Sequence, residues 1–382
     1  MSDDELWDLV VVGAGPAGAT AALAALRSKP GARVLLLDRA DFPRDKSCGD
    51  GIAPHAVDVL DALGAGDVVA GWTPVRALEL SRGRRAVSGR MRRPVWVIPR
   101  ETFDARLVAH AVAAGATLRR HRVRELRRKA DTYVVDETIR ARVVVGADGA
   151  HSVTRTHLAA PPGRRALAIR GYAPTSPELR GRQVIRYGER RQPSYAWSFD
   201  RGDGLANVGY GELVGTGEPP TRELLLDQLE RLFPGTVDGG TRWRGHHLPL
   251  SGWRWGADQP DGALLLVGDA AGLVNPMTGE GIYYAVATGS LAGRAAVRAM
   301  ADGDPAAAGA LHRRSVRRLL DRHLHHTWTA ARLSRSPTVV GAGITAAARD
   351  RRAFDALVEL GLGDGRITPR LAAGLAVGLL QD

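Results

Sequence analysis

The chain has 382 residues, of which 44% are hydrophobic and 25% are charged. This is the composition of a globular protein with a large buried core, and it excludes wholesale disorder and fibrous repeats. The formal charge of +12 comes with no zinc-finger, RNA-recognition or basic-zipper pattern, so we predict no nucleic acid partner. The basic residues form either a solvated arginine-rich face or a surface for a diphosphate or an anionic membrane.

Targeting and redox signals favour the cytoplasm. No apolar run reaches the roughly 18 residues that a membrane-spanning helix needs. The first residues are acidic where a secretory signal would be basic, so we interpret them as leading into the first strand. The single cysteine, Cys48, excludes an internal disulfide and a cysteine-rich metal site. We expect a cytoplasmic protein, with peripheral contact at the inner face of the membrane as an alternative.

The first forty residues predict one βαβ unit. Leu9–Val12 is a short apolar run of β-branched character, as expected of a buried parallel strand. Ala17–Arg27 is rich in alanine and leucine and predicts a helix. Arg33–Leu37 is the second predicted strand.

The middle of the chain changes its pattern. Residues 102–114 predict a helix, and residues 116–146 contain short strand-like runs. From about residue 165 to residue 255, hydrophobic and polar residues alternate with period two, which is typical of an antiparallel sheet with one wet face.

The last third is mainly helical. Ala263–Val267 predicts another buried strand, and a long helix of small residues follows from about Gly279 to Met300. Beyond residue 305 the pattern is helical, with a break at Ser336–Pro337. The apolar stretch Leu371–Leu380 is too short to span a membrane, and it either dips into a bilayer or closes the core.

A glycine-rich loop of the form GxGxxG joins the first predicted strand to the first helix. Its first glycine permits a tight turn, its second lets a pyrophosphate approach the backbone, and its third lets the helix pack closely on the sheet. The helix N-terminus then offers free N–H groups to phosphates. The loop consists of Gly13, Ala14, Gly15, Pro16, Ala17 and Gly18.

Asp38 ends the second predicted strand, 20 residues after Gly18. A carboxylate at this distance accepts hydrogen bonds from an adenosine ribose, and it favours an unphosphorylated ribose. The loop, both strands and the acid together predict a site for NAD or FAD rather than NADP.

Two later strands each end in a glycine–aspartate turn, GADG at Asp148 and GDAA at Asp269. With the glycine loop, this set resembles the flavoproteins that share the p-hydroxybenzoate hydroxylase fold. The resemblance implies that Asp269 holds the ribityl chain of FAD. It also implies that a helix N-terminus lies at the flavin ring, where its dipole stabilises the reduced ring, and that the ring lies near Pro276, Gly279, Gly281 and Ile282.

Further segments resemble the geranylgeranyl reductase family of FAD-dependent oxidoreductases. Residues 38–54 resemble its FPR-x-K-x-CGDG segment, and residues 98–104 its next block, in which the arginine contacts FAD. Residues 123–125 resemble the strand whose backbone reaches the adenine. The resemblance extends from about residue 8 to residue 300. It implies additional FAD-binding positions at Arg39, Arg44, Cys48, Gly49, Gly51, Arg100, Val123 and Asp148.

Residues 193–199 resemble the substrate-domain segment of the same family, with Asp200 standing where the family usually has proline. By period-two spacing, Tyr195, Trp197 and Phe199 lie on one face of a strand. They form either an aromatic wall over the flavin, holding an apolar chain or an aromatic ring, or a plain contact between the sheet and the core.

Cys48 and the histidines are the remaining candidates for chemistry. The Cys48 thiol is either an active-site proton donor or an inert buried residue. His151 follows the GADG turn, and we interpret it as a capping or surface residue. No acid or cysteine completes a metal site around the other paired histidines, so we predict no metal. We expect surface or lipid-facing positions for His246, His247, His323, His325 and His326.

The predicted function follows from the resemblance. We expect an FAD-dependent reductase that saturates C=C bonds of a polyprenyl, geranylgeranyl-type chain, with hydride from flavin N5 and a proton from Cys48 or water. The expected substrates are a polyprenyl diphosphate, a prenyl lipid or a prenylquinone. Because no second GxGxxG binds a nicotinamide, the external reductant is either NAD(P)H or a small electron carrier. The alternatives are an FAD-dependent monooxygenase that hydroxylates an aromatic or polyketide-like substrate, and a non-catalytic flavin-binding or lipid-carrier protein.

The predicted fold class is α/β. A Rossmann-like FAD-binding domain is interleaved with an antiparallel-sheet substrate domain, and a helical C-terminal region follows. The expected limits are 1–75, 98–160 and 258–300 for the FAD-binding domain, 76–97 and 161–257 for the substrate domain, and 301–382 for the helical region.

Overall fold

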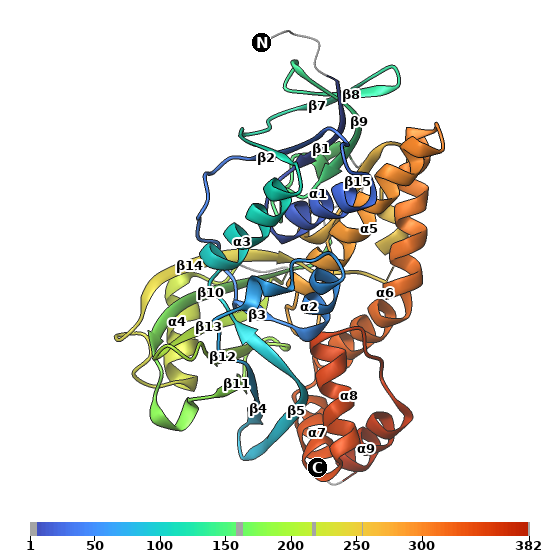
Figure 1. The fold of residues 1–382 in the computed structure, drawn as a ribbon. Coiled ribbons are helices and arrows are strands. Elements are labelled where there is room, and N and C mark those ends of the chain that lie inside the picture. The colour runs from blue at the N-terminus through green and yellow to red at the C-terminus, as the bar shows by residue number, and fades with distance from the viewer. Residues whose placement is uncertain (1–5, 158–162, 216–218, 254, 381–382) are drawn as a thin grey trace.

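The computed structural model describes residues 6–157, 163–215, 219–253 and 255–380. It contains two sheets and a group of C-terminal helices, and the ends of the chain lie at opposite ends of the molecule (Figure 1). The N-terminal residues 1–5, which we argued are no export signal, lie outside the described residues. So do the expected domain limits at 160 and 161. The domain limits as a whole stay a prediction.

The central strands of the first sheet are parallel and buried on both faces, as is typical of parallel sheets, whereas the hairpin at one edge is antiparallel. Val10 of the first strand is in register with Leu35 on one side and with Val144 on the other. The strands run in the order β6-β2-β1-β9-β8-β7, and β15 also pairs with β9. Their bounds are β1 Leu6–Val12, β2 Val34–Asp38, β6 Thr117–Arg120, β7 Leu126–Lys129, β8 Thr132–Val135, β9 Ile139–Gly146 and β15 Leu264–Leu266.

Helices cover this sheet, and two of them approach unusually closely. A Cβ atom at Gly289 would lie 2.2 Å from the carbonyl oxygen of Ala17, and one at Gly293 would lie 2.2 Å from that of Ala21. The two helices therefore pack backbone against backbone, which only glycine permits at these positions. The helices of this layer are α1 Pro16–Ser28, α2 Pro54–Asp61, α3 Arg100–Ala113 and α5 Ile282–Ala301.

The second sheet is antiparallel except where β11 pairs in parallel with β4. Its order is β14-β10-β13-β12-β11-β4-β5-β3. On one face, Leu225 and Leu229 of α4 (Arg222–Leu232) pack against Tyr210, and the other face turns towards the first layer. The bounds are β3 Gly51–Ile52, β4 Val75–Arg82, β5 Arg85–Val97, β10 Arg165–Pro174, β11 Arg182–Tyr187, β12 Tyr195–Asp200, β13 Leu205–Leu213 and β14 Thr241–Pro249.

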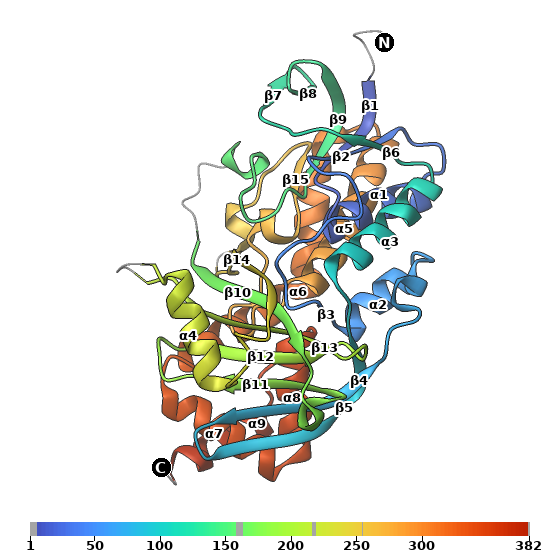
Figure 2. The same cartoon turned by 90° about the vertical axis from the view of Figure 1, so that its left-hand side faces the viewer.

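The C-terminal region is helical, and the predicted break at Ser336–Pro337 is confirmed. Helix α6 runs beside both layers towards the remaining helices (Figure 1). Val340 and Ile344 of α7 pack against Leu80 of β4 and the neighbouring hairpin strand β5 (Figure 2). The helices are α6 Ala308–Leu333, α7 Pro337–Arg349, α8 Arg351–Leu362 and α9 Pro369–Leu379. Among the described residues, no helix combines the length and the apolar character needed to traverse a bilayer.

Short 3-10 helices complete the architecture: η1 Gly66–Val69, η2 Thr154–His157, η3 Pro177–Leu179, η4 Trp255–Asp258, η5 Gly268–Ala271 and η6 Pro305–Ala307. The fold class predicted from the sequence is confirmed. One local prediction is wrong, because residues 123–125 form no strand and instead connect β6 to β7. The N–H groups of Arg124 and Glu125 donate to the carboxylate of Asp136, so they do not join a strand ladder.

The close packing of α1 on α5 gives a first prediction. Gly293→Ala places a methyl group against the backbone of Ala21, and overpacking of this kind lowers the free energy of unfolding by about 1–3 kcal/mol. Chemical denaturation measures the change. The control is Gly343→Ala in α7, where the nearest atom to the new Cβ, Leu375 Cδ2, is 3.6 Å away. That variant should be as stable as the wild type or slightly more stable, since alanine favours helix. Equal stability of both variants would contradict the backbone contact.

Candidate functional site

The site lies where neighbouring parallel strands end. Gly13 follows β1, Asp148 follows β9 and Asp269 follows β15. Strand β9 pairs in parallel with both β1 and β15, so all three carboxyl ends meet at one edge of the sheet. Asp38, the last residue of β2, lies at the same edge. Ligands of open α/β sheets bind at this edge.

The glycine loop is held in one conformation by backbone contacts. Gly13 has a φ of +99°, and a Cβ there would lie 2.3 Å from the carbonyl oxygen of Ala147. A Cβ at Gly18 would lie 1.8 Å from the carbonyl oxygen of Gly13. Asp38 Oδ2 accepts a hydrogen bond of 2.9 Å from the N–H of Ala14. Asp38 therefore stabilises the glycine loop and also lies at the end of β2.

Two guanidinium groups converge on the middle glycine of the loop. A Cβ at Gly15 would have Arg44 Nη2 at 3.5 Å and Arg100 Nη2 at 3.8 Å as its nearest neighbours. Arg100 is 3% exposed and donates to both oxygens of Asp104, at 2.7 and 2.8 Å. Arg44 also pairs with Asp104, at 3.1 Å, and with Asp38, at 3.5 Å. The nearest neighbours of Gly15 are therefore two guanidinium groups, whose N–H groups suit a diphosphate.

A second charged pair lies at the end of β15. Lys46 Nζ lies 3.2 Å from Asp269 Oδ2. Burial alone would raise the pKa of Asp269, but the Lys46 ammonium outweighs it, so that this pKa is lowered. The pKa of the neighbouring His246 falls to about 4 because it is buried and faces Lys46. At neutral pH the group therefore contains an ammonium, a carboxylate and an uncharged imidazole.

Asp148 uses its carboxylate within its own turn. It accepts hydrogen bonds from the hydroxyl groups of Ser152 and Thr154 and from the N–H groups of Val153 and Thr154. These bonds hold η2 in place at the end of β9. The prediction that Asp148 binds a cofactor stays a prediction, with the turn backbone rather than the carboxylate available for it.

The N-terminus of α5 faces the same space. Gly281 is its N-cap, and a Cβ there would lie 3.6 Å from Asp269 Oδ1. The preceding Glu280 accepts a hydrogen bond of 2.8 Å from the N–H of Tyr283, and burial raises its pKa to about 7. The helix starts at Ile282, so the predicted start at about Gly279 is slightly early.

A cavity of about 230 Å³ joins this edge to the second sheet. Its polar end is lined by Pro16, Lys46, Cys48, Arg100, Asp269 and Gly281. Its apolar end is lined by side chains of the antiparallel sheet and of α8, including Leu78, Ile185, Trp197, Leu248, Leu357 and Leu362. The glycine-loop edge and a hydrocarbon-lined space are thus parts of one cavity.

The three aromatic residues of β12 line this cavity side by side. The ring centroids of Tyr195 and Trp197 are 6.0 Å apart, and those of Trp197 and Phe199 are 6.3 Å apart. Tyr187 of β11 extends the row, at 5.9 Å from Tyr195. Their shared strand face, expected from the spacing, is confirmed. The Tyr195 hydroxyl donates to the carbonyl oxygen of Thr278, which ties the row to the loop before α5.

Asn207 of β13 links this row of aromatic side chains, the aromatic row, to the segment that contains Cys48. We call that segment, residues 45–50, the cysteine loop. Trp197 Nε1 donates to Asn207 Oδ1 at 2.8 Å. Asn207 Nδ2 donates to the carbonyl oxygen of Cys48 and to Asp50 Oδ2, both at 2.8 Å. We assigned no role to Asn207 from the sequence. The available signal was an amide residue in the middle of an otherwise apolar strand run.

Asp50, at the end of the cysteine loop, carries a buried carboxylate. It is fully buried, and it accepts a hydrogen bond of 2.5 Å from the Tyr172 hydroxyl. Burial raises its pKa to about 6, although Arg170 opposes that rise. Arg170 is itself 1% exposed and pairs with Asp45. This network anchors residues 45–50 to the second sheet, and the sequence alone did not indicate it.

Cys48 lines the cavity with its thiol in the protonated form. Burial raises the pKa of the thiol above its ordinary value, although the nearby Arg100 guanidinium opposes the rise. Arg100 and Cys48 both line this cavity. A thiol in this setting keeps its proton at neutral pH, and a cation stands beside it to stabilise the thiolate.

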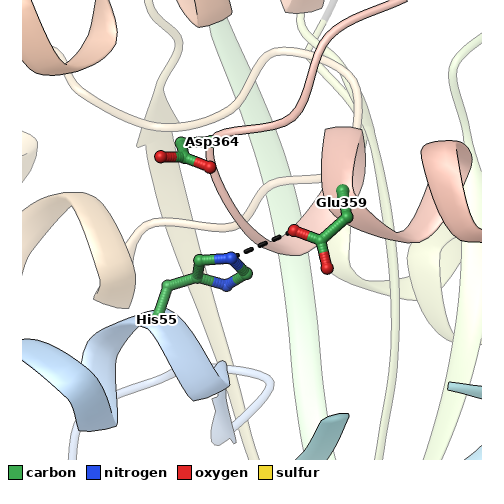
Figure 3. A group of neighbouring side chains, drawn as sticks. All are labelled: His55, Glu359 and Asp364. Atoms are coloured by element: carbon green, nitrogen blue, oxygen red, sulfur yellow. Dashed lines mark ion pairs between the residues drawn. The ribbon is translucent and has the colours of Figure 1, made fainter. Parts of the chain in front are cut away.

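An ion pair fixes the helix that closes the cavity. His55 Nε2 of α2 lies 3.0 Å from Glu359 Oε2 of α8, and Asp364 lies close by (Figure 3). The Glu359 carboxylate raises the pKa of His55. The three side chains bring their ligand atoms within 4.8 Å of one another, but the paired nitrogen and oxygen account for the arrangement without a metal. Helix α8 carries Leu357 and Leu362 of the cavity wall.

The prediction of a surface or lipid-facing position is wrong for two histidines, His246, which lines the site cavity beside Lys46, and His323. His323 is 1% exposed, and its ring nitrogens interact with the Tyr284 hydroxyl and with the carbonyl oxygen of Gly365 at 2.6 Å. The error at His323 arose because α6 is buried against α5 on one side. His325, on another side of the same helix, packs at a tilt against the half-exposed Trp253, with ring centroids 4.2 Å apart.

Comparison with known proteins gives matches along most of the chain. The FAD binding domain family matches residues 7–182. The menaquinone reductase of Mycolicibacterium smegmatis is 33% identical over 315 residues, covering 75% of this chain and 75% of that protein. The geranylgeranyl diphosphate reductase of Rhodobacter capsulatus is 34% identical over 326 residues, covering 78% of this chain and 77% of that protein.

A solved structure shares the fold. It is a geranylgeranyl bacteriochlorophyll reductase-like protein from Thermoplasma acidophilum, which superposes with a TM-score of 0.79 at 20% identity. The superposition covers 98% of this chain and 99% of that chain, so it includes the C-terminal helices for which the sequence offered no resemblance.

Asp50 gives a pH-dependent prediction. Its pKa rises from 3.8 to about 6 on folding, so its contribution to stability is full below pH 3.8 and is lost as the pH rises through 6. Asparagine has no charge to bury, keeps an acceptor for Tyr172, and tolerates the φ of +58° at this position. Relative to Asp50→Asn, the wild type should lose about 2 kcal/mol of unfolding free energy between pH 4.5 and pH 7.5.

Urea denaturation of both proteins at both pH values measures this difference. The control is Asp238→Asn, which makes the same change to a carboxylate on the exposed surface. A difference for Asp50→Asn that does not change with pH would show that the Asp50 carboxylate is not destabilised by burial.

Proposed function

This chain belongs to the geranylgeranyl reductase family of FAD-dependent oxidoreductases, and from that membership we propose that it saturates carbon–carbon double bonds of a polyprenyl chain. The observation that carries the proposal is the single cavity that joins the glycine-loop edge to a wall of aliphatic and aromatic side chains. A nucleotide cofactor and a hydrocarbon chain can meet in such a cavity, away from water.

The residues at the sheet edge fit FAD. We propose that its pyrophosphate lies before Gly15, at the N-terminus of α1 and beside Arg44 and Arg100, because the helix N–H groups and the two guanidinium groups can donate to phosphate oxygens. FAD supplies the hydride for the double bond when it is bound. The other positions that we propose for its ribose, adenine, ribityl chain and ring are Asp38, Arg39, Val123, Asp269, Pro276, Gly279, Gly281 and Ile282, together with Cys48, Gly49 and Gly51.

We propose Cys48 as the proton donor. Reduction of an isolated double bond adds a hydride to one carbon and a proton to the other, so the site needs a group that holds a proton at neutral pH. The raised pKa of the Cys48 thiol meets this need, and Arg100 lies close enough to stabilise the thiolate that remains. The alternative donor is an ordered water molecule.

The apolar end of the cavity supports a prenyl substrate. Tyr195, Trp197 and Phe199 offer a row of aromatic faces along which a branched hydrocarbon chain can be held. Alignment in a dry cavity supplies much of the rate for such a reaction. The names of the two relatives specify a menaquinone and a geranylgeranyl diphosphate, both of which carry prenyl chains. The proposed substrate is therefore a polyprenyl diphosphate, a prenyl lipid or a prenylquinone.

Two further parts of the proposal concern partners. Because the sequence has a single GxGxxG, we propose that NAD(P)H or a small electron carrier reduces the cofactor without a second nucleotide-binding fold. We also propose that α6 contacts an anionic membrane surface at the inner face. Arg314, Arg318 and Arg322 are exposed there, and Trp328 of the same helix meets Trp253 edge to face, with ring centroids 5.1 Å apart.

An anaerobic reoxidation experiment tests the proposed reaction. Holoenzyme reduced with dithionite should be reoxidised by geranylgeranyl diphosphate or by a prenylated quinone, with recovery of the flavin absorbance and a saturated product by mass spectrometry. Reoxidation by none of these lipids, together with hydroxylation of an aromatic compound in the presence of oxygen, would replace the proposal by the monooxygenase function. Purified protein that neither contains nor takes up flavin would contradict both.

Cys48→Ala tests the proton donor. The variant should bind FAD as the wild type does but turn over about 10- to 1,000-fold more slowly, the range for a lost general acid. The matched control is Ser47→Ala at the adjacent position, where the hydroxyl donates to the carbonyl oxygen of Arg244 instead of facing a reacting group. Its turnover should change little. If Cys48→Ala also turns over at the wild-type rate, the proton comes from water.

A further inference from the structure

A second apolar chamber lies among the C-terminal helices. Its volume is about 70 Å³, and it is enclosed mainly by α6, α7, α8 and α9. The residues that enclose it include Ala330, Val340, Ile344, Leu360, Leu371 and Leu375. Among the described residues, none of the side chains that line the chamber is charged. An apolar lining of this kind is suited to hydrocarbon.

One layer of side chains separates this chamber from the site cavity. Leu80, Tyr187, Pro193, Met277 and Leu357 line both spaces. The same five side chains therefore form the wall between the two spaces. A methionine in such a position adapts its shape readily, because its side chain is unbranched and has three rotatable bonds.

The position of the chamber relates it to the aromatic row. The row that begins at Phe199 and passes through Trp197 and Tyr195 ends at Tyr187, and Tyr187 belongs to the dividing layer. A chain that follows this row away from Cys48 therefore arrives at the second chamber. The chamber is the continuation of the site cavity in the direction that leads away from the polar edge.

The protein's own side chains leave part of the chamber unfilled. Gly343 of α7 faces it, and a Cβ there would meet only Leu375 Cδ2, at the ordinary contact distance of 3.6 Å. Helix interiors favour alanine over glycine, and closed cores favour filled voids. A small residue here keeps space open that a more stable packing would remove.

We propose that the second chamber receives the distal isoprene units of the substrate chain, so that the protein selects prenyl chains long enough to reach it. The inference rests on the proposed function, since it names the length of the chain that the same site takes. The dividing side chains move aside when a long chain enters, and they close the site cavity behind a short one. The C-terminal helices thereby act in substrate selection.

The first measurement is of binding and needs no turnover. Saturated isoprenoid alcohols of increasing length are titrated into oxidised holoenzyme, and the flavin absorbance reports their affinity. We expect the affinity of the wild type to rise at least tenfold when the chain becomes long enough to enter the chamber. An affinity that stops rising once the site cavity is filled would overturn the inference, whatever the substrate of the enzyme.

Filling the chamber should remove this dependence. Gly343→Leu and Leu375→Trp each place bulk in the chamber, and two variants guard against a folding failure in one. We expect each to lose the tenfold preference for long chains. The control is Ala373→Leu on the exposed side of α9, which should keep the preference. Two results would contradict the second chamber as a binding site. One is a loss of affinity that is equal for all chain lengths, and the other is a preference for long chains that persists in both variants.

Removing part of the dividing layer should have the opposite effect. Tyr187→Ala joins the two spaces, and we expect long chains to gain affinity relative to short ones, whereas an unchanged ratio would contradict the dividing role. The outcome is separable from that of the proposed reaction. If long chains bind by this pattern but no prenyl lipid reoxidises the reduced flavin, the result supports the chamber as a binding site and contradicts the reductase function.

Discussion

The structure depends on the pairing of one strand with two others. Strand β9 lies beside β1 and also beside β15, although β15 follows it by more than a hundred residues. That pairing brings the glycine loop, the Asp148 turn and Asp269 to one edge of the sheet. The close contact of α1 with α5 through Gly289 and Gly293 holds the same arrangement from the other side of the layer. Without these contacts the chain would possess the motifs but no common site.

Burial of charge organises the polar end of the cavity. Arg100 and Asp104 are almost fully buried and satisfy each other through two hydrogen bonds, and Lys46 compensates the partly buried Asp269. Removal of these charges from water is costly, so each one needs its partner in place. The Cys48 thiol stays neutral in this environment for the same reason. Asn207 then connects the cysteine loop to the aromatic row, which places charged and apolar surfaces within one cavity.

The C-terminal helices complete the site although they lie outside the region of sequence resemblance. Helix α8 supplies part of the cavity wall and is fixed by the pair between His55 and Glu359 and by hydrogen bonds from Asn275 to the carbonyl oxygens of Leu360 and Gly361. These contacts join residues that are far apart in the chain. Their geometry makes the helical region a part of the cavity wall.

Features that depend on neighbours along the chain could be predicted from the amino-acid order alone. The spacing of glycines defined the loop, apolar runs defined the buried strands, and period two placed Tyr195 and Phe199 on one strand face. Features that depend on packing required the tertiary structure. The sequence did not reveal that Asn207 bonds to the cysteine loop, that His323 is buried, or that residues 123–125 leave the strand ladder. Partners for these groups come from distant segments, and a hydrogen bond or a cavity exists only once such segments are brought together.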